Sequence, residues 1–340
     1  MAKRLAAEWE KQDGILIAWP NQRTDWAYIL KDVEKTYIEI SKAISEYEKV
    51  IILTNNRDGL KKRLNKEKVN ITNLILLELR YNDTWARDFG PLVLKEEDGF
   101  EILDFTFNGW GLKFPACFDN LITRNLYKNG FFKNSRLKTL NFVLEGGAIE
   151  TNGEGIILTT ERCLLSPNRN PEFSKEEIET KLKEYLSAKE IIWIKNGYLE
   201  GDDTDSHIDT LVRFARENTI LYVSPPEDKS DPHYHELKRM EEEIENLKNR
   251  FNILSLPFAP VVLDKNGNRL PSTYANFLIT NEALLLPSYR DKKLDFLAIE
   301  VIKQAFPAKE IVMIDSIPLI HQHGSIHCIT MQLPQGILNV

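Results

Sequence analysis

A cysteine beside a histidine near the carboxyl end is the first candidate for chemistry. Cys328 follows His327 and a loop that contains Gly324, and an apolar segment comes directly after it. A thiol attacks as the thiolate, whose unperturbed pKa is about 8.5, so nearby cationic or hydrogen-bonding groups must favour the anion. Cys117 and Cys163 lack such a polar loop, and we expect both to be small buried apolar residues. Cys328 could have that plain role too.

A histidine and three carboxylic acids could complete a site around this thiol. His207 and Asp209 form an H-x-D pair at the expected start of a strand, where residues i and i+2 point to the same face and could contact one ligand together. Asp88 lies in WARDFGP, and Glu145 precedes two glycines, which permit close approach or a positive φ. The plainer alternatives are a surface His–Asp pair, a salt bridge between Asp88 and Arg87, and a solvated acid at Glu145.

The same carboxyl-terminal segment could instead be a zinc site. His321, His323, His327 and Cys328 are close in sequence, and the second and third of these would share one face of a helix. However, Gly324 and the following apolar residues predict a loop and a strand. No C-x-x-C or H-E-x-x-H motif accompanies the segment. We therefore expect no metal and no other cofactor, and zinc stays the alternative.

Five copies of a strand–helix–strand unit are expected to position these residues. The clearest copy has strands at 156–160 and 191–195 around a helix from Ser174 to Ala188, which begins with a capping box formed with Glu177. Each unit is long enough for a crossover, so its strands can be parallel. The strands expected in the other four copies cover residues 14–20, 49–55 and 74–80; 101–107 and 137–143; 220–225 and 251–258; and 283–289 and 311–315.

Short turns join each unit to the next, with DG and NG marking two of them, so each unit contributes a hairpin strand to its successor. The strand at 14–20 has no predecessor, and the strand expected at 325–334 has no successor. Pairing these two strands would close a ring. We therefore predict an α/β fold in which five repeated units close into a ring and form one domain over residues 1–340. A doubly wound two-domain sheet is the alternative, but it does not explain the hairpins.

Loops that follow equivalent strands of such a ring meet at its axis. This places the candidate thiol, histidine and carboxylates in one region, although they are far apart in the sequence. The loops concerned cover residues 81–91, 144–150, 198–209, 266–277 and 321–328.

The composition narrows the class of protein. The 44 basic and 51 acidic residues give a formal net charge of −7, which disfavours a nucleic-acid partner. No run approaches the ~20 apolar residues of a membrane span, and the first residues lack the apolar segment of a signal peptide. Three widely spaced cysteines do not form a disulfide framework. We expect a soluble cytoplasmic protein with no membrane association.

Together, the segments NDTWARDFGP, FNGWGLKF, LEGGAIE, SHID and HGSIHCITMQLP resemble the agmatine deiminase and bacterial peptidylarginine deiminase family of guanidine-modifying enzymes. The resemblance extends from residue 18 to residue 334 and implies that the ring is a five-bladed α/β propeller with pseudo-fivefold symmetry. It also implies that Cys328 attacks the guanidinium carbon and that His207 is the general acid and base. Asp88 and Asp209 would bind the guanidinium nitrogens, with Glu145 supporting that site.

The resemblance implies hydrolysis of agmatine to N-carbamoylputrescine and ammonia through a covalent amidino-cysteine intermediate. Such an enzyme would serve putrescine and polyamine biosynthesis, and the family suggests a homodimer. Trp85 and Trp110 are candidate walls for the aliphatic chain of the substrate, or else plain core aromatics. The alternatives are a peptidylarginine or free arginine deiminase, in which Arg87 or Arg269 could face a carboxylate, and a non-catalytic polyamine-binding protein.

Overall fold

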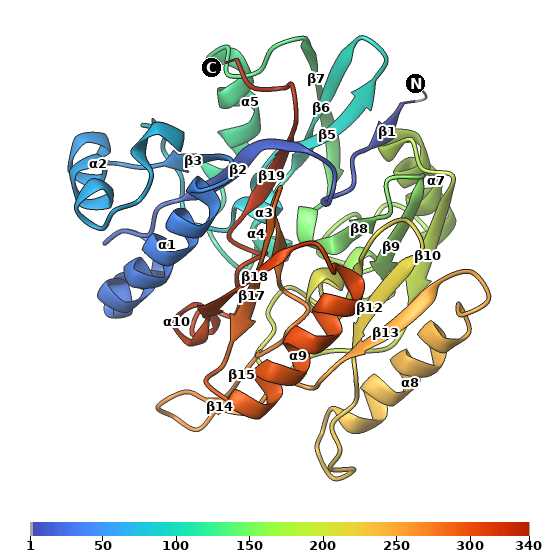
Figure 1. The fold of residues 1–340 in the computed structure, drawn as a ribbon. Coiled ribbons are helices and arrows are strands. Elements are labelled where there is room, and N and C mark those ends of the chain that lie inside the picture. Colours follow the sequence, from blue (N-terminus) through green and yellow to red (C-terminus); the bar gives the residue numbers. More distant parts are fainter. Residues whose placement is uncertain (1–2, 340) are drawn as a thin grey trace.

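The computed structural model describes residues 3–339 and has an α/β fold built from mixed sheets. Five of these sheets repeat one pattern, in which a middle strand is antiparallel to one neighbour and parallel to the other. Figure 1 shows the larger helices at the periphery of the molecule and the sheets inside them. The predicted strand–helix–strand units and the hairpins between them are thus confirmed, as are the parallel strands within each unit.

The first sheet joins the two ends of the chain. Its strands are β19 (Met331–Pro334), β2 (Gln12–Ala18), β3 (Lys49–Leu53) and β4 (Leu74–Leu77), in this order. Met331 is paired with Leu16 in antiparallel register, so the predicted pairing of the terminal strands is present. The helical segments of this unit are η1 (Asp25–Ile29), α1 (Leu30–Ser45), α2 (Arg57–Lys66) and η2 (Ile71–Asn73).

The second and third sheets follow along the chain. In the second, β1 (Arg4–Leu5), β5 (Leu92–Glu96), β6 (Gly99–Thr106) and β7 (Ser135–Val143) are adjacent, with α3 (Ala86–Phe89), α4 (Gly109–Leu112), η3 (Asp119–Leu121) and α5 (Ile122–Lys128) in the connections. The third contains β8 (Ile149–Thr151), β9 (Ile156–Thr160) and β10 (Glu190–Ile194), with η4 (Gly146–Ala148), α6 (Glu161–Leu164) and α7 (Lys175–Leu186). Strand β1 was not predicted.

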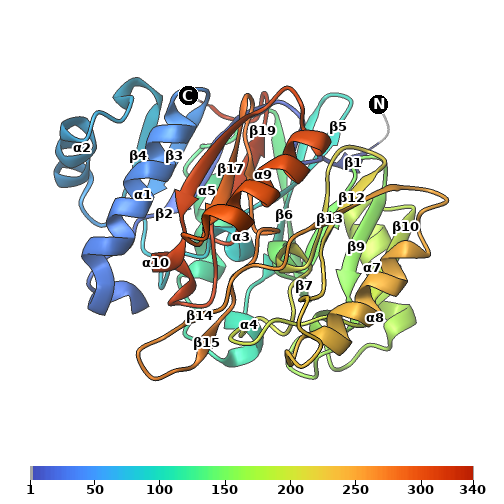
Figure 2. The same ribbon diagram turned by 60° about the horizontal axis from the view of Figure 1, so that its bottom comes forward.

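The fourth and fifth sheets complete the repeats, and Figure 2 shows them with α8 and α9 on their outer side. The fourth has β11 (Val212–Phe214), β12 (Thr219–Val223) and β13 (Asn252–Leu256), with η5 (Ile208–Thr210) and α8 (Tyr234–Glu245). The fifth has β16 (Leu278–Ile279), β17 (Ala283–Ser288) and β18 (Glu310–Asp315), with α9 (Lys292–Ala305) and α10 (Ile317–Ile320). Between them lies an unpredicted two-stranded sheet of β14 (Val262–Leu263) and β15 (Arg269–Leu270).

Local sequence signals account for the helices that cover these sheets. Helix α1 buries Val33, Tyr37, Ile40 and Ile44, whose spacing of three and four residues places them on one face toward the core. Helix α7 begins with the predicted capping box, in which the Ser174 hydroxyl accepts from the backbone N–H of Glu177 while the Glu177 carboxylate accepts from that of Ser174. No helix within residues 3–339 is long and apolar enough to cross a membrane.

The strand predicted over 325–334 is shorter than expected. Residues 325–330 turn instead of pairing, because the Asn276 side-chain oxygen accepts from the backbone N–H groups of His327 and Cys328 at 3.0 and 3.2 Å. The Thr330 hydroxyl also bonds back to the carbonyl of Ile326 at 2.9 Å. Cys328 therefore lies on a fixed turn just before β19.

Candidate active site

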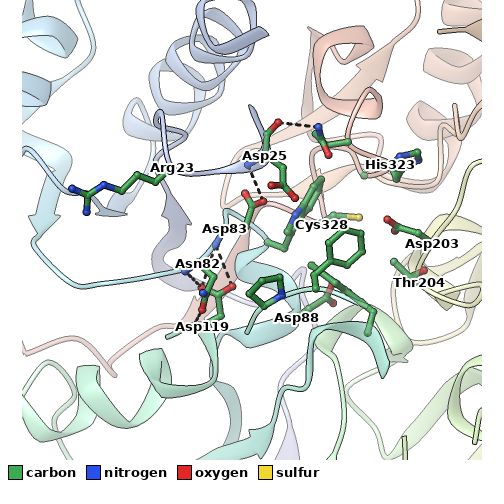
Figure 3. A pocket seen from close by; sticks show the side chains of 16 residues that line it. Arg23, Asp25, Asn82, Asp83, Asp88, Asp119, Asp203, Thr204, His323 and Cys328 are labelled. Atoms are coloured by element: carbon green, nitrogen blue, oxygen red, sulfur yellow. Dashed lines mark hydrogen bonds between the residues drawn. The ribbon is translucent and has the colours of Figure 1, made fainter. Parts of the chain in front are cut away.

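The Cys328 thiol lines a small cavity of about 140 Å³ that opens to the surface of the molecule (Figure 3). Its side chain is largely buried, and Sγ lies 3.9 Å from Oδ2 of Asp209. Burial, followed by the proximity of the Asp209 and Asp88 carboxylates, raises the pKa of this thiol well above its ordinary value. These surroundings favour the neutral form of the thiol.

Asp88 is fixed by hydrogen bonds to the floor of the same cavity. Its Oδ1 accepts from the backbone N–H of Gly147, and its Oδ2 accepts from Nε1 of Trp110, each at 2.9 Å. Burial raises the pKa of Asp88, and the nearby carboxylates of Asp209 and Glu145 add to the effect. The alternative salt bridge to Arg87 is absent, since the Arg87 guanidinium bonds to the carbonyl of His327 and to the side chain of Gln332.

His207 and Asp209 do not lie on a strand, so the predicted strand geometry was wrong. His207 precedes the short helix η5, and the strand β11 begins only at Val212. The chain turns here because the side chain of Asp202 accepts from the backbone N–H of Ser206 at 2.7 Å. The turn still directs both side chains toward Gly147, where an added Cβ would lie 2.6 Å from His207 Nδ1 and 3.2 Å from Asp209 Oδ2.

The His207 ring is buried with both of its nitrogens free of hydrogen-bond partners in the described part of the chain. Nδ1 lies 3.7 Å from Oδ1 of Asp88. Burial lowers the pKa of His207 to about 3, which outweighs the opposite effect of the neighbouring Asp209 carboxylate. The ring is therefore a neutral imidazole, the form that accepts a proton.

Asp209 has one occupied and one free oxygen. Oδ2 accepts from Nδ1 of His327 at 2.7 Å, whereas Oδ1 is buried and has no hydrogen-bond partner among residues 3–339. Burial alone would raise the pKa of Asp209, but the hydrogen bond from His327 and the charge of Arg213 lower it below its ordinary value. This carboxylate is therefore ionised although no solvent reaches it.

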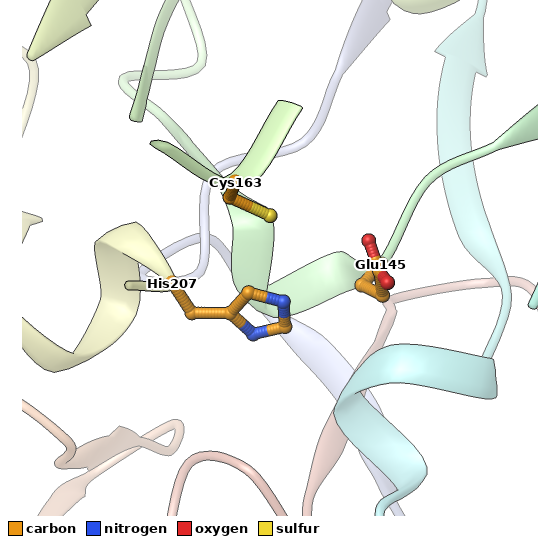
Figure 4. Close-up of side chains that lie close together, drawn as sticks. All are labelled: Glu145, Cys163 and His207. Carbon is orange, nitrogen blue, oxygen red and sulfur yellow. The ribbon is translucent and has the colours of Figure 1, made fainter. Parts of the chain in front are cut away.

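Glu145 is buried, so the alternative of a solvated turn acid is wrong. Its Oε1 accepts from Nε of Arg169 at 2.7 Å, and its Oε2 is unpartnered within the described chain. Figure 4 shows the carboxylate beside the His207 ring and the Cys163 thiol, and one ligand atom of each residue lies within 4.8 Å of the others. Burial raises the pKa of Glu145, against the opposing effect of Arg169.

The two glycines after Glu145 let neighbouring groups pack against the backbone, and neither glycine has a positive φ. Gly146 packs against the carbonyl of Arg87, and Gly147 is the point on which His207, Asp88 and Asp209 converge. Three acid and base groups from two loops thus surround one backbone position that has no side chain.

Trp85 and Trp110 form part of the cavity wall, as predicted. Their rings meet edge to face with centroids 6.3 Å apart, and both side chains are mostly buried. Gly324 packs directly on the Trp85 ring, since a Cβ at that position would collide with it. Trp110 adopts a positive φ of 56°, and its ring nitrogen donates to Asp88. The two tryptophans therefore belong to the site as well as to the core.

The outer part of the cavity is acidic. Burial raises the pKa of Asp83 to about 7 and that of Asp119 to about 8. Arg23 also lines the cavity, but its side chain is exposed and extends away from the other labelled residues in Figure 3. The aspartates that line the cavity are Asp25, Asp83, Asp88, Asp119 and Asp203.

The proposed zinc cluster does not form. His323 Nδ1 contacts the carbonyl of Gly201 at 2.6 Å, whereas the His327 ring lies between Asp209 and Glu8. Within residues 3–339, the two groups whose ligand atoms come close enough to hold a metal are Glu145, Cys163 and His207, and Glu8, Glu150 and His327. Neither contains His321, His323 or Cys328. Cys117 is exposed, so the expectation that it is buried was also wrong.

Four residues behind the site were not predicted from the sequence. Asn276 fixes the backbone of His327 and Cys328, and Arg169 pairs with Glu145. Arg213 is fully buried and bonds to both Glu8 and Glu150. A signal was available for Arg213, a charged residue inside an apolar strand, which must have partners when it is buried. No signal in the sequence indicated Glu8, because this residue comes near the site only when the chain folds.

Comparison with known proteins agrees with this geometry. The chain belongs to the Porphyromonas-type peptidyl-arginine deiminase family, whose model matches residues 4–334. A Legionella pneumophila protein named "putative agmatine deiminase" is 34% identical over 98% of this chain and 95% of its own length.

Solved structures are equally similar. A C. jejuni agmatine deiminase variant with substrate bound has a TM-score of 0.91 and 37% identity, covering 98% of this chain and 97% of its own. A Porphyromonas gingivalis protein described as a "putative arginine deiminase" has a TM-score of 0.91 and 44% identity, covering 99% and 100%. The predicted resemblance is thus confirmed, and the homologues are enzymes that hydrolyse C–N bonds of guanidino groups.

Proposed function

We propose that this protein is an agmatine deiminase that hydrolyses agmatine to N-carbamoylputrescine and ammonia. The observation that carries the proposal is the free acceptor set beside Cys328. One oxygen of Asp209, one of Glu145 and both nitrogens of His207 are buried without partners in the described chain. Buried polar groups are normally hydrogen-bonded, and one nitrogen of a neutral imidazole is an N–H donor, so these three free acceptors and one free donor indicate a missing ligand rich in donors. The substrate-bound C. jejuni relative supports the same conclusion.

A guanidinium ion is the donor that fits this set. It is planar and permanently charged, and its N–H groups form a fork that carboxylates match in two places at once. Asp88 and Cys328 line the cavity, and Asp209 lies beside the Cys328 sulfur with its Oδ1 free. We infer that the guanidinium lies at this end of the cavity, with its nitrogens donating to both aspartates and to Glu145.

Substrate binding also activates the nucleophile. Asp209 and Asp88, which hold the cation, also raise the pKa of the Cys328 thiol. A bound guanidinium offsets their negative charge, so it favours the thiolate. The thiol is therefore activated mainly when a cationic substrate is present, which limits its reactivity toward other electrophiles.

The reaction then follows in two covalent steps. The Cys328 sulfur attacks the guanidinium carbon while neutral His207 takes the thiol proton. His207 passes this proton to one –NH₂ group, which leaves as ammonia, and the carbon stays bound to sulfur as an amidino thioether. Water then gives a proton to His207 and attacks the same carbon, and the C–S bond breaks. The ureido product and the thiol are released, and the remaining proton converts ammonia to ammonium.

The acidic outer cavity favours agmatine over arginine. Agmatine has a second cation at its far end, and Asp83, Asp119 and Asp203 line the path toward it. A cation at that end would favour the ionised form of these aspartates, whereas the carboxylate of arginine would find no cationic partner among them. The basic candidates for a carboxylate are engaged elsewhere: Arg87 bonds to Gln332, and Arg269 forms an ion pair with Asp231 at 2.9 Å.

The test is a substrate panel with purified protein. Agmatine, free arginine and a peptidyl arginine are compared at equal concentration by ammonia release and by a colorimetric assay for the ureido group. We expect turnover of agmatine at least 100-fold faster than of the other two. Cys328→Ser should bind agmatine in calorimetry but lose turnover by about 10³-fold or more. Faster turnover of an arginine substrate would assign the protein to its alternative class, and binding without turnover by the wild type would indicate a polyamine-binding protein.

We further infer that the five repeated sheets are the blades of a closed propeller that forms a single domain. The pairing of β19 with β2 supports this, because it joins the last unit to the first. The family resemblance also suggests a homodimer, which light scattering of the purified protein would test.

A further inference from the structure

The side chain of His327 connects two parts of the buried site. Its Nδ1 lies 2.7 Å from Oδ2 of Asp209, and its Nε2 lies 2.9 Å from Oε2 of Glu8. The ring and both carboxylates are almost completely buried. His327 precedes the nucleophile in sequence but does not line the substrate cavity, so the mechanism above gives it no role.

The hydrogen bond to Asp209 has a fixed direction. A carboxylate that is ionised can only accept, so Nδ1 of His327 must carry the proton that it donates. On the other side, Nε2 faces Glu8 at 2.9 Å and Nη2 of Arg213 at 3.1 Å. Nε2 donates to Glu8 in the charged ring and accepts from Arg213 in the neutral ring. The Nδ1–H group points at Asp209 in both forms.

The remote end of His327 is held by a set of buried charges. Arg213 forms ion pairs with Glu8, at 2.6 Å, and with Glu150, and it also donates to the carbonyls of Ala275 and Phe277. These contacts fix Glu8 and Arg213 on one side of the ring. Because the ring is planar and rigid, fixing its Nε2 edge also fixes the position of Nδ1.

We infer that His327 is a positioning residue that orients the guanidinium-binding carboxylate of Asp209. By occupying Oδ2, it leaves Oδ1 as the oxygen available to the substrate. The backbone N–H groups of His327 and Cys328 share one acceptor, the side-chain oxygen of Asn276. The His-Cys pair thus sets the nucleophile and the carboxylate that holds its target relative to each other. This inference rests on the proposed deiminase function.

Two amide substitutions test the two ends of the His327 ring independently. His327→Asn places an amide N–H near the former Nδ1 and can still donate to Asp209. His327→Gln places its amide near the former Nε2, so it keeps the Glu8 and Arg213 end and leaves Asp209 without a donor. Loss of one hydrogen bond to a charged group corresponds to about 10- to 100-fold. We expect His327→Gln to lose about 100-fold in kcat/KM for agmatine, and His327→Asn to lose about 10-fold or less.

A matched control is available at His233. This ring is buried as well, its Nδ1 lies 2.7 Å from Oδ1 of Asp231, and its Nε2 accepts from the backbone N–H of Glu200 at 2.8 Å. His233→Gln keeps an acceptor for Glu200 and removes the contact with the aspartate, as His327→Gln does. It should show a comparable loss of Tm with kcat/KM per folded molecule unchanged.

The pH profile gives a readout that a purely structural role would not move. The titratable and charged groups that act on Asp209 are His327, His207, Cys328, Asp88, Asp202, Arg213 and Arg87. Without its donor the Asp209 carboxylate takes up a proton more readily, so the acid limb of kcat/KM should shift to higher pH in His327→Gln and less so in His327→Asn. Equal losses in the two variants with an unmoved acid limb, or no loss in either, would overturn the inference.

If His327→Gln fails to fold, Glu8→Gln becomes the test. It weakens the anchor of the ring without changing the ring itself, and we expect a loss of about 3- to 10-fold with an acid-limb shift in the same direction. Unchanged kcat/KM and an unchanged acid limb in folded Glu8→Gln would then refute the role of His327. A wild-type protein that turns over no guanidine at all would refute the proposed function instead, so the two failures are distinguishable.

Discussion

The substitution Gly147→Ala tests the proposed roles of His207 and Asp88 most directly. The added methyl group would lie 2.6 Å from Nδ1 of His207 and 2.9 Å from Oδ1 of Asp88. Ordinary contacts of a Cβ begin at 3.4 Å, so the imidazole must retreat by 0.8 Å (3.4 minus 2.6) and the Asp88 oxygen by 0.5 Å (3.4 minus 2.9). A misplacement of about 1 Å in a catalytic constellation costs about 10²-fold in rate. We expect kcat/KM for agmatine to fall at least 100-fold.

The protein itself should tolerate this change. Gly147 lies in a 3₁₀ turn without a positive φ, so alanine can adopt the same backbone and keep the N–H donated to Asp88. Overpacking costs about 1–3 kcal/mol, and the loss of glycine flexibility returns about 0.4–1 kcal/mol of this. Urea unfolding should therefore show a loss of about 1–2 kcal/mol, with a fully folded enzyme at 25 °C.

The control is Gly59→Ala, which adds the same methyl group on the exposed helix α2. There the new Cβ would collide with the side chain of Asn56, the N-cap of that helix, which must move; this helix is far along the chain from the loops of the site. We expect a small loss of stability and unchanged kcat/KM. If folded Gly147→Ala kept kcat/KM within about threefold of the wild type, the positions of His207 and Asp88 could not matter to the reaction, and the assignment of the site would be wrong.

Two further predictions concern buried charges. Arg169→Met leaves the buried Glu145 carboxylate without its cation, so the free energy of unfolding in urea should fall by about 3–5 kcal/mol. Adding Glu145→Gln should recover part of this loss. Equal stabilities of the single and double variants would contradict the pairing. Burial lowers the pKa of His207 to about 3 from an ordinary value of 6.5, so the unfolded chain binds a proton on this group that the folded protein does not. The contribution of His207 to the free energy of unfolding is complete above pH 6.5. It is lost as the pH falls from 6.5 toward 3, by about 1.4 kcal/mol per pH unit. Over that window the free energy of unfolding should therefore fall less steeply in His207→Gln than in the wild type.

Much of the fold was predictable because the signals are local. Alternating apolar strands, helix caps and turn residues each act over a few positions, and the capping box at Ser174 is present as expected. The pairing of β19 with β2 was predictable by elimination, since each strand lacked another partner in the sequence pattern. The very short strands β1, β14 and β15 were missed because two residues carry no periodicity.

The candidate site was predictable as a set of residues but not as a geometry. Cys328, Asp88 and the two tryptophans line the cavity as predicted, and His207 approaches Asp88 behind them. The H-x-D pair was assigned to a strand, whereas side-chain hydrogen bonds from Asp202 turn the chain there. Such contacts compete with strand formation and leave no periodic trace in the sequence.

By itself, the sequence determined the repeated units, the loops that carry chemistry and the types of residue in them. Only the tertiary structure decided which groups are free and which are engaged. Arg87 and Glu8 illustrate the difference: Arg87 lies beside Asp88 in sequence yet bonds to Gln332, whereas Glu8 contacts His327 from the other end of the chain. The reason is physical. Burial and long-range hydrogen bonds set the charge and direction of a side chain, and both depend on groups brought together only when the chain folds.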